Sequence, residues 1–186
     1  NHQLKNNNMK TTFGILAALF VLTVVLQDSY SQKIDGWFKA GSKPDSYDWG
    51  KSDEKYNDGA VYFLKSKEPA IDGFGTIMTY IMPEKYSGKR IRLTGYVKNE
   101  SITGWAGMWM RVDGTDKNKS LGFDNMSNRA IAGTNDWTKY EIVLDVAPEA
   151  IGIAYGFLVN GTGNAWFSGF TLEAVGNDVP TTDMDK

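Results

Sequence analysis

From residue 32 onward, apolar and polar positions follow one another in short runs separated by Gly, Asn, Asp, Pro or Lys. Each run is 4 to 11 residues long and rich in Val, Ile, Tyr, Phe or Trp, which is typical of β-strands. An apolar period of 3.6 residues is not kept for three turns anywhere in this region, so we expect no long helix. The expected strands are Trp37–Gly41, Ala60–Ser66, Gly75–Met82, Arg90–Asn99, Trp105–Asp113, Ser120–Phe123, Thr138–Val146, Ile151–Val159 and Ala165–Val175.

Nine short strands in a domain of this size predict an all-β fold, either an antiparallel β-sandwich or a barrel. Alternation indicates which face of a strand is buried, because successive side chains point to opposite faces. Ile91, Leu93 and Val97 share one face of their strand, opposite arginine, threonine and lysine. The run at 151–159 is apolar on both faces, which predicts a central strand.

The segment Trp105–Asp113, WAGMWMRVD, is the most informative stretch for function. Its period of two places one apolar set on the core face: Ala106, Met108, Met110 and Val112. The opposite face carries Trp105, Trp109, Arg111 and Asp113, and Gly107 leaves room between the two indoles. Flat aromatic rings beside planar hydrogen-bonding groups suit a sugar, whose C–H face stacks while its hydroxyls bond to Arg, Asp and Asn.

A structural interpretation of the same residues stays open. The tryptophans can be core residues, and Arg111 with Asp113 can form a same-face ion pair worth under about 1 kcal/mol. Asp124 and Asn125 follow in a loop near the end of this strand. We expect them to face the ligand, or else to cap turns through their own backbone. Trp137 and Trp166 stand next to turns, and we interpret them as core residues.

Catalysis and metal binding find little support in the sequence. A glycosidase needs two carboxyl groups about 5 to 9 Å apart across a cleft. The candidate acids are scattered along the chain: Asp113, Asp124, Glu141, Asp145 and Glu173. We therefore expect no enzyme, no catalytic residue and no cofactor. A structural calcium ion held by Asp side chains and loop carbonyls stays an open alternative, although no Asp-rich loop has EF-hand spacing.

The segment 10–31 is typical of an export signal. Lys10 is followed by the apolar run Phe13–Leu26, and Ser29 and Ser31 provide small residues before a cleavage site at Gln32. Fourteen helical residues span about 21 Å, which is too short for a membrane core of about 30 Å, so we expect no stable span after cleavage. An uncleaved anchor is the alternative.

These features divide the chain into three parts. Residues 1–31 comprise upstream residues and a signal-peptide helix, with Met9 as the natural start. Residues 32–176 are the β-sandwich domain, and residues 177–186 form a polar tail that we expect to be frayed. The expected location is exported, either periplasmic or extracellular.

Composition excludes several classes of function. The chain has no cysteine, which removes disulfides, thiol catalysis and Cys-ligated metals. Its single histidine is His2, so the chain after residue 31 offers no histidine as a general base, triad member or metal ligand. A formal net charge of −2 gives no electrostatic footprint for nucleic acid.

Several longer segments carry a resemblance to a known group. They are YSGKRIRLTGYVK (86–98), WAGMWMRVDG (105–114), FDNM (123–126), GTNDWTKYEIVLDV (133–146) and YGFLVNGTGNAWF (155–167). Together they resemble bacterial galactose-binding-like accessory domains, which are similar to carbohydrate-binding modules. Such domains occur alone, beside AraC-type regulators and ahead of S41-type peptidases. The resemblance implies a two-sheet jelly roll over 37–176.

This sequence departs from the pattern at Ser168 and Gly169, where similar domains usually carry Asp-Asp. We therefore expect no structural or metal-assisting acid at that turn.

Two functional hypotheses follow from the sequence. The first is an exported, non-catalytic module that binds carbohydrate or a similar polar small ligand through Trp105, Trp109, Arg111, Asp113, Asp124 and Asn125. The second is an envelope module that binds a protein partner and uses its tryptophans as core. Exposure of Trp105 or Trp109 in a concave patch near Arg111 distinguishes the first from the second.

Overall fold

A computed structural model describes residues 36–184 of the chain. The expected signal-peptide helix, the cleavage site before Gln32 and His2 lie outside the described residues. The strands are β1 (Phe38–Gly41), β2 (Tyr47–Tyr56), β3 (Gly59–Ser66), β4 (Phe74–Ile81), β5 (Arg90–Asp113), β6 (Ser120–Asp124), β7 (Ile131–Asp145), β8 (Gly152–Asn160) and β9 (Asn164–Val175). Two short 3₁₀ turns, η1 (Pro44–Ser46) and η2 (Ser127–Arg129), complete the described elements.

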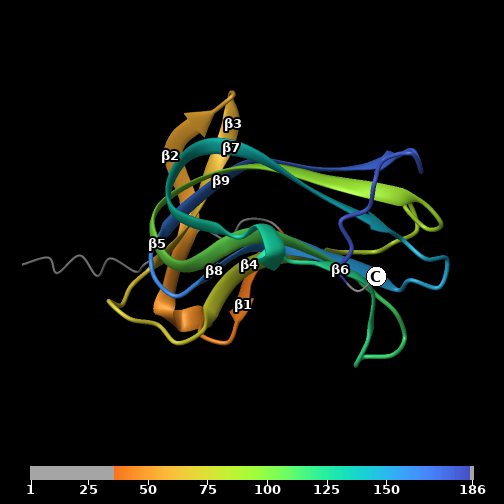
Figure 1. Ribbon diagram of the computed structural model, residues 1–186, viewed down its shortest axis with the longest axis horizontal. Coiled ribbons are helices and arrows are strands. Elements are labelled where there is room, and N and C mark those ends of the chain that lie inside the picture. The colour runs from red at the N-terminus through yellow and green to blue at the C-terminus, as the bar shows by residue number, and fades with distance from the viewer. Residues whose placement is uncertain (1–35, 185–186) are drawn as a thin grey trace, which may run out of the picture.

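The strands form two layers that share the long strand β5 (Figure 1). The first half of β5 pairs with β7 on one side and with β9 on the other. β9 pairs in turn with β3, and β3 pairs with β2 at the edge. The second half pairs with β8 and β6, and β8 continues through β4 to β1. All these pairings are antiparallel, so the predicted all-β antiparallel two-sheet β-sandwich is confirmed. We call the two layers the β7 layer and the β6 layer.

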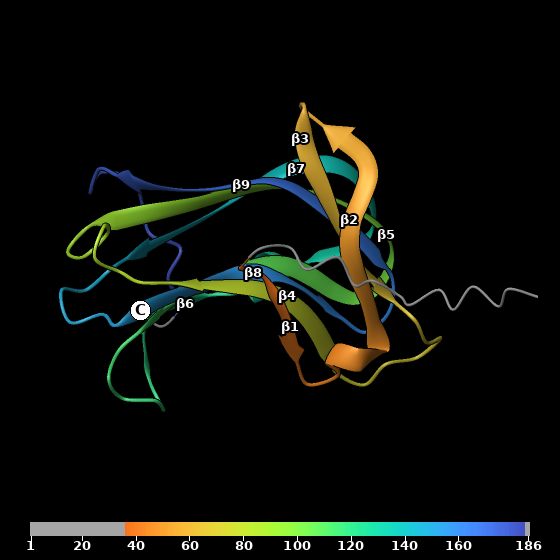
Figure 2. The ribbon, with the colours of Figure 1, turned by 180° about the vertical axis from the view of Figure 1, so that it is seen from behind.

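Three strand predictions need correction. The strand expected at 138–146 begins at Ile131 and runs through the turn expected before Trp137. The runs at 90–99 and 105–113 belong to one strand, because the backbone between them stays paired to β7 at Asn99, Ile102 and Ala106. The segment Tyr47–Tyr56 was not predicted, yet it forms the edge strand β2. Its sequence YDWGKSDEKY is polar because only Tyr47 and Gly50 in it are buried. Figure 2 shows from behind how the β2–β3 hairpin stands at the end of the molecule where β5 crosses.

The crossing of β5 changes which residues face the core. In the first half, odd-numbered residues such as Ile91 and Leu93 are fully buried. In the second half, even-numbered residues such as Met108 and Met110 are fully buried. Ser101 lies between the halves with a φ of 55°, and the pairing with β7 shifts register on both sides of it. This irregularity lets one strand contribute two halves to a single core despite strict alternation within each half.

The C-terminal strap, which we define as Asn177–Met184, closes the side of the sandwich between β6 and β7 (Figure 1). Arg90 donates to the carbonyls of Asn177 and Val179 at 2.8 and 2.6 Å. The Thr182 N–H donates to the Val143 carbonyl at 2.8 Å, and the Met184 N–H donates to the Phe123 carbonyl at 2.8 Å. The expected fraying of this tail was therefore wrong for residues 177–184, because its backbone pairs with two strand edges.

The strap gives a direct test through Thr182. Its Oγ1 accepts a hydrogen bond from the Val143 N–H at 2.9 Å. Thr182→Val leaves that N–H without an acceptor and lowers the free energy of unfolding by about 1 kcal/mol. Thr181→Val is the matched control, since the neighbouring threonine is also half-buried. Urea unfolding measures both, and equal stability of the two variants would contradict the role of the strap.

Tyr47 provides a second test of the packing. It is 1% exposed, and its hydroxyl donates to the Gly161 carbonyl at 2.6 Å. Burial raises the pKa of Tyr47 to about 12, above the value of about 10 expected in the unfolded chain. The stability from the neutral phenol is therefore complete below pH 10 and is lost as pH rises toward 12. In urea unfolding at a series of pH values, Tyr47→Phe should show a smaller loss of stability over this window than the unaltered chain. An identical loss in both proteins would contradict the assignment.

Candidate functional site

The second half of β5 presents the face that the sequence predicted. The apolar set Ala106, Met108, Met110 and Val112 is fully buried between the layers. Trp105, Trp109, Arg111 and Asp113 lie on the opposite face, outside the β6 layer. The alternation predicted for this segment is therefore confirmed.

Two indoles and two hydrogen-bonding side chains meet in one cavity on this face. The cavity, which we call the apolar hollow, has a volume of about 310 Å³. Trp105, Trp109, Arg111 and Asn125 line it, so it brings together four of the six predicted site residues. Neighbouring strands complete the lining with Ala40, Gly41, Phe74, Thr76, Met78, Phe123, Leu158 and Asn160.

Trp109 forms a fixed part of this hollow. It is 7% exposed, and its Nε1–H donates to Thr76 Oγ1 at 2.8 Å. Thr76 Oγ1 in turn donates to the Phe157 carbonyl at 2.8 Å. The polar atom of the indole is thus already bonded, so Trp109 has only apolar ring surface to offer. Trp105 is half-buried and keeps more of its ring accessible.

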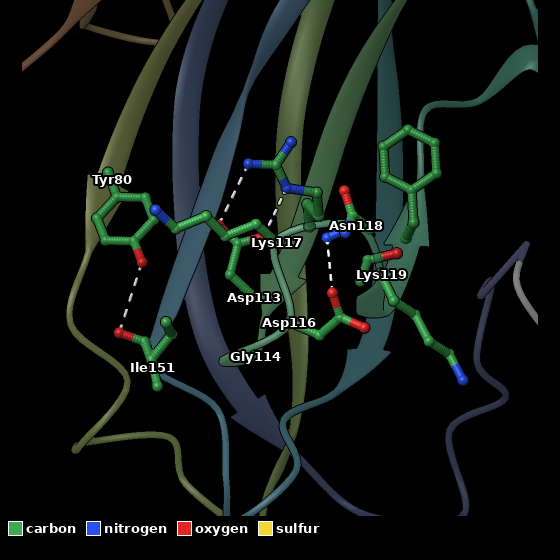
Figure 3. A pocket seen from close by; sticks show the side chains of 11 residues that line it. Tyr80, Asp113, Gly114, Asp116, Lys117, Asn118, Lys119 and Ile151 are labelled. Carbon is green, nitrogen blue, oxygen red and sulfur yellow. Dashed lines mark hydrogen bonds and ion pairs between the residues drawn. The ribbon is translucent and has the colours of Figure 1, made fainter.

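A second cavity adjoins the first. This polar hollow has a volume of about 490 Å³ and shares Arg111 and Phe123 with the apolar hollow. Figure 3 shows Tyr80, Asp113, Ile151 and the loop at 114–119 around it, with Lys117 extended toward Tyr80. The two hollows therefore lie next to each other on the outer face of the β6 layer, and we call them together the groove.

Arg111 stands where the hollows meet and is held in place by Asp113. Its Nε and Nη2 groups donate to the two carboxylate oxygens of Asp113 at 2.6 and 3.2 Å. The same-face ion pair predicted as the structural alternative therefore exists. It is compatible with ligand contact, because the Arg111 side chain remains 45% exposed.

Asp124 lies in neither hollow. It is 0% exposed, and its oxygens accept hydrogen bonds from Arg129 at 2.6 and 3.0 Å. It also accepts from the Met126 N–H at 2.8 Å, which is the turn-capping role foreseen as the alternative. Alternation along β6 explains the difference, since Phe123 points to the groove and Asp124 points inward. Asn125 follows and lines the apolar hollow.

The loop after β6 also fills the space expected above Gly107. A Cβ atom built there would lie 3.0 Å from the Asn125 carbonyl oxygen and 3.2 Å from Met126 Cβ. The expectation of an open gap between the indoles was therefore wrong. Gly107 instead allows the 124–129 loop to approach β5 closely and to form a wall of the apolar hollow.

Several groove residues were not predicted, notably Phe74, Thr76 and Met78 of β4 and Leu158 of β8. Thr76, Met78 and Tyr80 share one face of a strand that was predicted, so alternation alone could have grouped them. Their place beside Trp109 depends on the pairing order β4-β8-β5, which sequence pattern does not reveal.

The five acids considered for glycoside hydrolysis all form ion pairs. Asp113 pairs with Arg111, Asp124 with Arg129, and Asp145 with Arg90. Glu141 and Glu173 both pair with Arg92. The hydrogen bond from Lys139, together with the positive charges of Lys139 and Arg92, lowers the pKa of Glu141. In residues 36–184 no group of three or more metal-ligating side chains is placed to hold a metal ion.

Trp137 and Trp166 were predicted as core residues, and this was wrong. Both are half-buried on the outer face of the β7 layer. The Trp137 ring stacks on Tyr56 at a centroid distance of 4.4 Å. The Lys65 and Lys98 Nζ atoms lie 5.0 and 5.5 Å from the Trp166 ring. Aromatic and cationic neighbours cover these rings in place of core contacts.

Known proteins share the sequence in part and the fold more widely. No family model matches the chain. The chain is 35% identical over 162 residues to the uncharacterized HTH-type transcriptional regulator YbfP of Bacillus subtilis (strain 168), a match that covers 86% of this chain. The chain spans about half, 55%, of the length of that curated relative.

Solved structures resemble the sandwich at low sequence identity. The CBM22-1 xylan-binding domain of Paenibacillus barcinonensis Xyn10C is similar at a TM-score of 0.53 and 16% identity, over 76% of this chain and 87% of that domain. The tailspike protein 4 enzymatically active domain of bacteriophage CBA120 is similar at 0.59 and 15% identity, over 76% of this chain and 20% of that one. The described residues thus have the β-sandwich fold of carbohydrate-binding modules. Within residues 36–184 of this chain, no helix is long and apolar enough to cross a membrane.

The ion pair between Asp124 and Arg129 should stabilise the loop that forms one wall of the apolar hollow. Asp124→Asn leaves the Arg129 guanidinium without its carboxylate. The free energy of unfolding should fall by about 2 to 3 kcal/mol, less than for a fully buried pair because Arg129 is one-third exposed. Asp116→Asn, at an exposed aspartate, should change it by under about 0.5 kcal/mol. Urea unfolding of both variants tests this, and equal losses would show that the pair does not anchor the loop.

Proposed function

We propose that this chain is a non-catalytic module that binds carbohydrate in the groove on the outer face of the β6 layer. The apolar hollow carries the proposal, because it places Trp105 and Trp109 beside the polar groups of Arg111 and Asn125. A sugar ring has apolar C–H faces and a rim of hydroxyls, so it needs this combination of ring surface and planar hydrogen-bonding groups.

In this proposal the six predicted residues have different roles. Trp105 stacks on the ligand, and the immobile ring of Trp109 forms an apolar surface below it. Arg111, Asn125 and Asp113 bond to hydroxyls along the groove. Asp124 acts through the loop that it anchors and does not touch the ligand.

The fold supports the same class of ligand. The similar domain from Paenibacillus barcinonensis is described as xylan-binding, and that ligand belongs to that protein. For this chain the likeness supports carbohydrate as the class and leaves the particular sugar to experiment. The export-signal pattern at 10–31 supports an exported module that meets its glycan in the periplasm or outside the cell.

A second function is favoured by one observation. The 35% identity to a protein named as a transcriptional regulator fits an accessory module that serves a larger assembly through protein contacts. The distinguishing measurement is titration with a panel of soluble glycans. A saturable response supports the binding module, and a flat response from folded protein favours the interaction module.

The groove assignment is tested by two tryptophans of similar exposure on opposite faces. Trp105→Ala removes the accessible indole of the apolar hollow and should weaken glycan binding at least about tenfold. Trp166→Ala removes a half-buried indole from the outer face of the β7 layer and should leave the affinity unchanged. Isothermal titration calorimetry provides the affinities, and circular dichroism confirms folding. Loss of binding in Trp166→Ala alone would place the ligand on the other layer.

A further inference from the structure

The polar hollow has a lining that differs from that of the apolar hollow beside it. Three cationic side chains, Arg111, Lys117 and Lys119, line it together with two acidic ones, Asp113 and Asp116. The chain as a whole has a formal charge of −2, whereas cationic residues outnumber acidic ones among those that line this cavity. The cavity is therefore a local exception to the charge of the molecule.

Both acids of the cavity are already engaged. The two carboxylate oxygens of Asp113 accept from Arg111 at 2.6 and 3.2 Å. Asp116 Oδ1 accepts from the Asn118 N–H at 2.9 Å and thereby shapes the loop between β5 and β6. The ion pairs formed within residues 36–184 include neither Lys117 nor Lys119. A positive charge thus stands beside the groove without an anionic partner in the described residues.

The opposite wall of the same cavity is apolar and accessible. Tyr80 is 43% exposed and Ile151 is 45% exposed, and both line the hollow. Figure 3 shows that Lys117 extends toward Tyr80 while Lys119 points away from the other labelled side chains. A sugar ring against Tyr80 would accordingly have Lys117 and Arg111 within the same cavity. Stacking surface and cationic charge come together at this point of the groove.

We propose that the polar hollow is a subsite for an acidic sugar, whose carboxylate is bound between Lys117 and Arg111. This inference rests on the proposed function, since the acidic residue is one unit of the glycan whose neighbour occupies the apolar hollow. A carboxylate offers two oxygens, one for the Lys117 ammonium and one for the Arg111 N–H groups that Asp113 does not engage. The ligand class is then an oligosaccharide that contains uronic acid.

The experiment compares acidic oligosaccharides with their own neutral forms. Trigalacturonate and a glucuronic acid-substituted xylotriose are each titrated calorimetrically beside the carboxyl-reduced counterpart, at low and at high salt. At least one acidic probe should bind about tenfold more tightly than its reduced form at low salt, and the difference should shrink at high salt.

The variant Lys117→Gln locates that preference. It should remove most of the advantage of the acidic probe and weaken the binding of the reduced probe much less. Lys67→Gln, at an exposed lysine that lines neither hollow, is the matched control and should change neither affinity. An acidic preference that survives Lys117→Gln would overturn the subsite.

The remaining outcomes separate this inference from the proposed function. Equal binding of acidic and reduced probes would overturn the acidic subsite and leave the carbohydrate module standing. No binding of any probe or of the neutral glycan panel would overturn both. Tighter binding of a sulfated oligosaccharide than of either carboxylated probe would overturn the assignment to uronic acid.

Discussion

The change of side-chain direction within β5 is the constraint on which the site depends. A regular strand from Arg90 to Asp113 would keep odd-numbered residues inward along its whole length and would bury Trp105 and Trp109 in the core. The left-handed conformation of Ser101, with register shifts around it, reverses the alternation where the strand passes from one layer to the other. The methionines of the second half then fill the core, and the indoles face outward.

Three further sets of contacts hold the groove in shape. Trp109 is bonded through Thr76 to the backbone of β8, and Asp124 holds the loop that forms one wall. The C-terminal strap bonds both the N–H and the carbonyl of Phe123, the residue shared by the two hollows along with Arg111. These groups are fixed before any ligand arrives, which reduces the entropy lost on binding. Binding proteins with rigid sites gain affinity in this way.

The sequence predicted local features well and non-local features poorly. Period-two alternation identified the buried and outward faces of 105–113, because both depend on neighbours in the chain. It missed β2, whose edge position leaves most of its side chains in water and its composition polar. It also divided β5 in two, since the polar segment around Ser101 resembles a turn although its backbone stays paired.

In the candidate site, too, local features were predicted and non-local ones were missed. Trp105, Trp109 and Arg111 were found from alternation, Asn125 from its place in a loop near the end of that strand, and the four meet in one hollow. Asp124 differs because it was expected in a loop after residue 123, whereas it is the last residue of β6 and points inward. The contributions of Thr76, Leu158 and Asn160 follow from strands that pair across long separations in sequence. Pairing order of this kind is set by the packing of the whole domain.

The most direct test is to locate the ligand on the folded protein by NMR. The indole N–H signals of Trp105, Trp109, Trp137 and Trp166 report on the two outer faces separately. On titration with a glycan that binds, the signals of Trp105 and Trp109 should shift while those of Trp137 and Trp166 stay in place. Shifts confined to Trp137 and Trp166 would show that the ligand occupies the β7 layer and that the groove on the β6 layer is not the binding site.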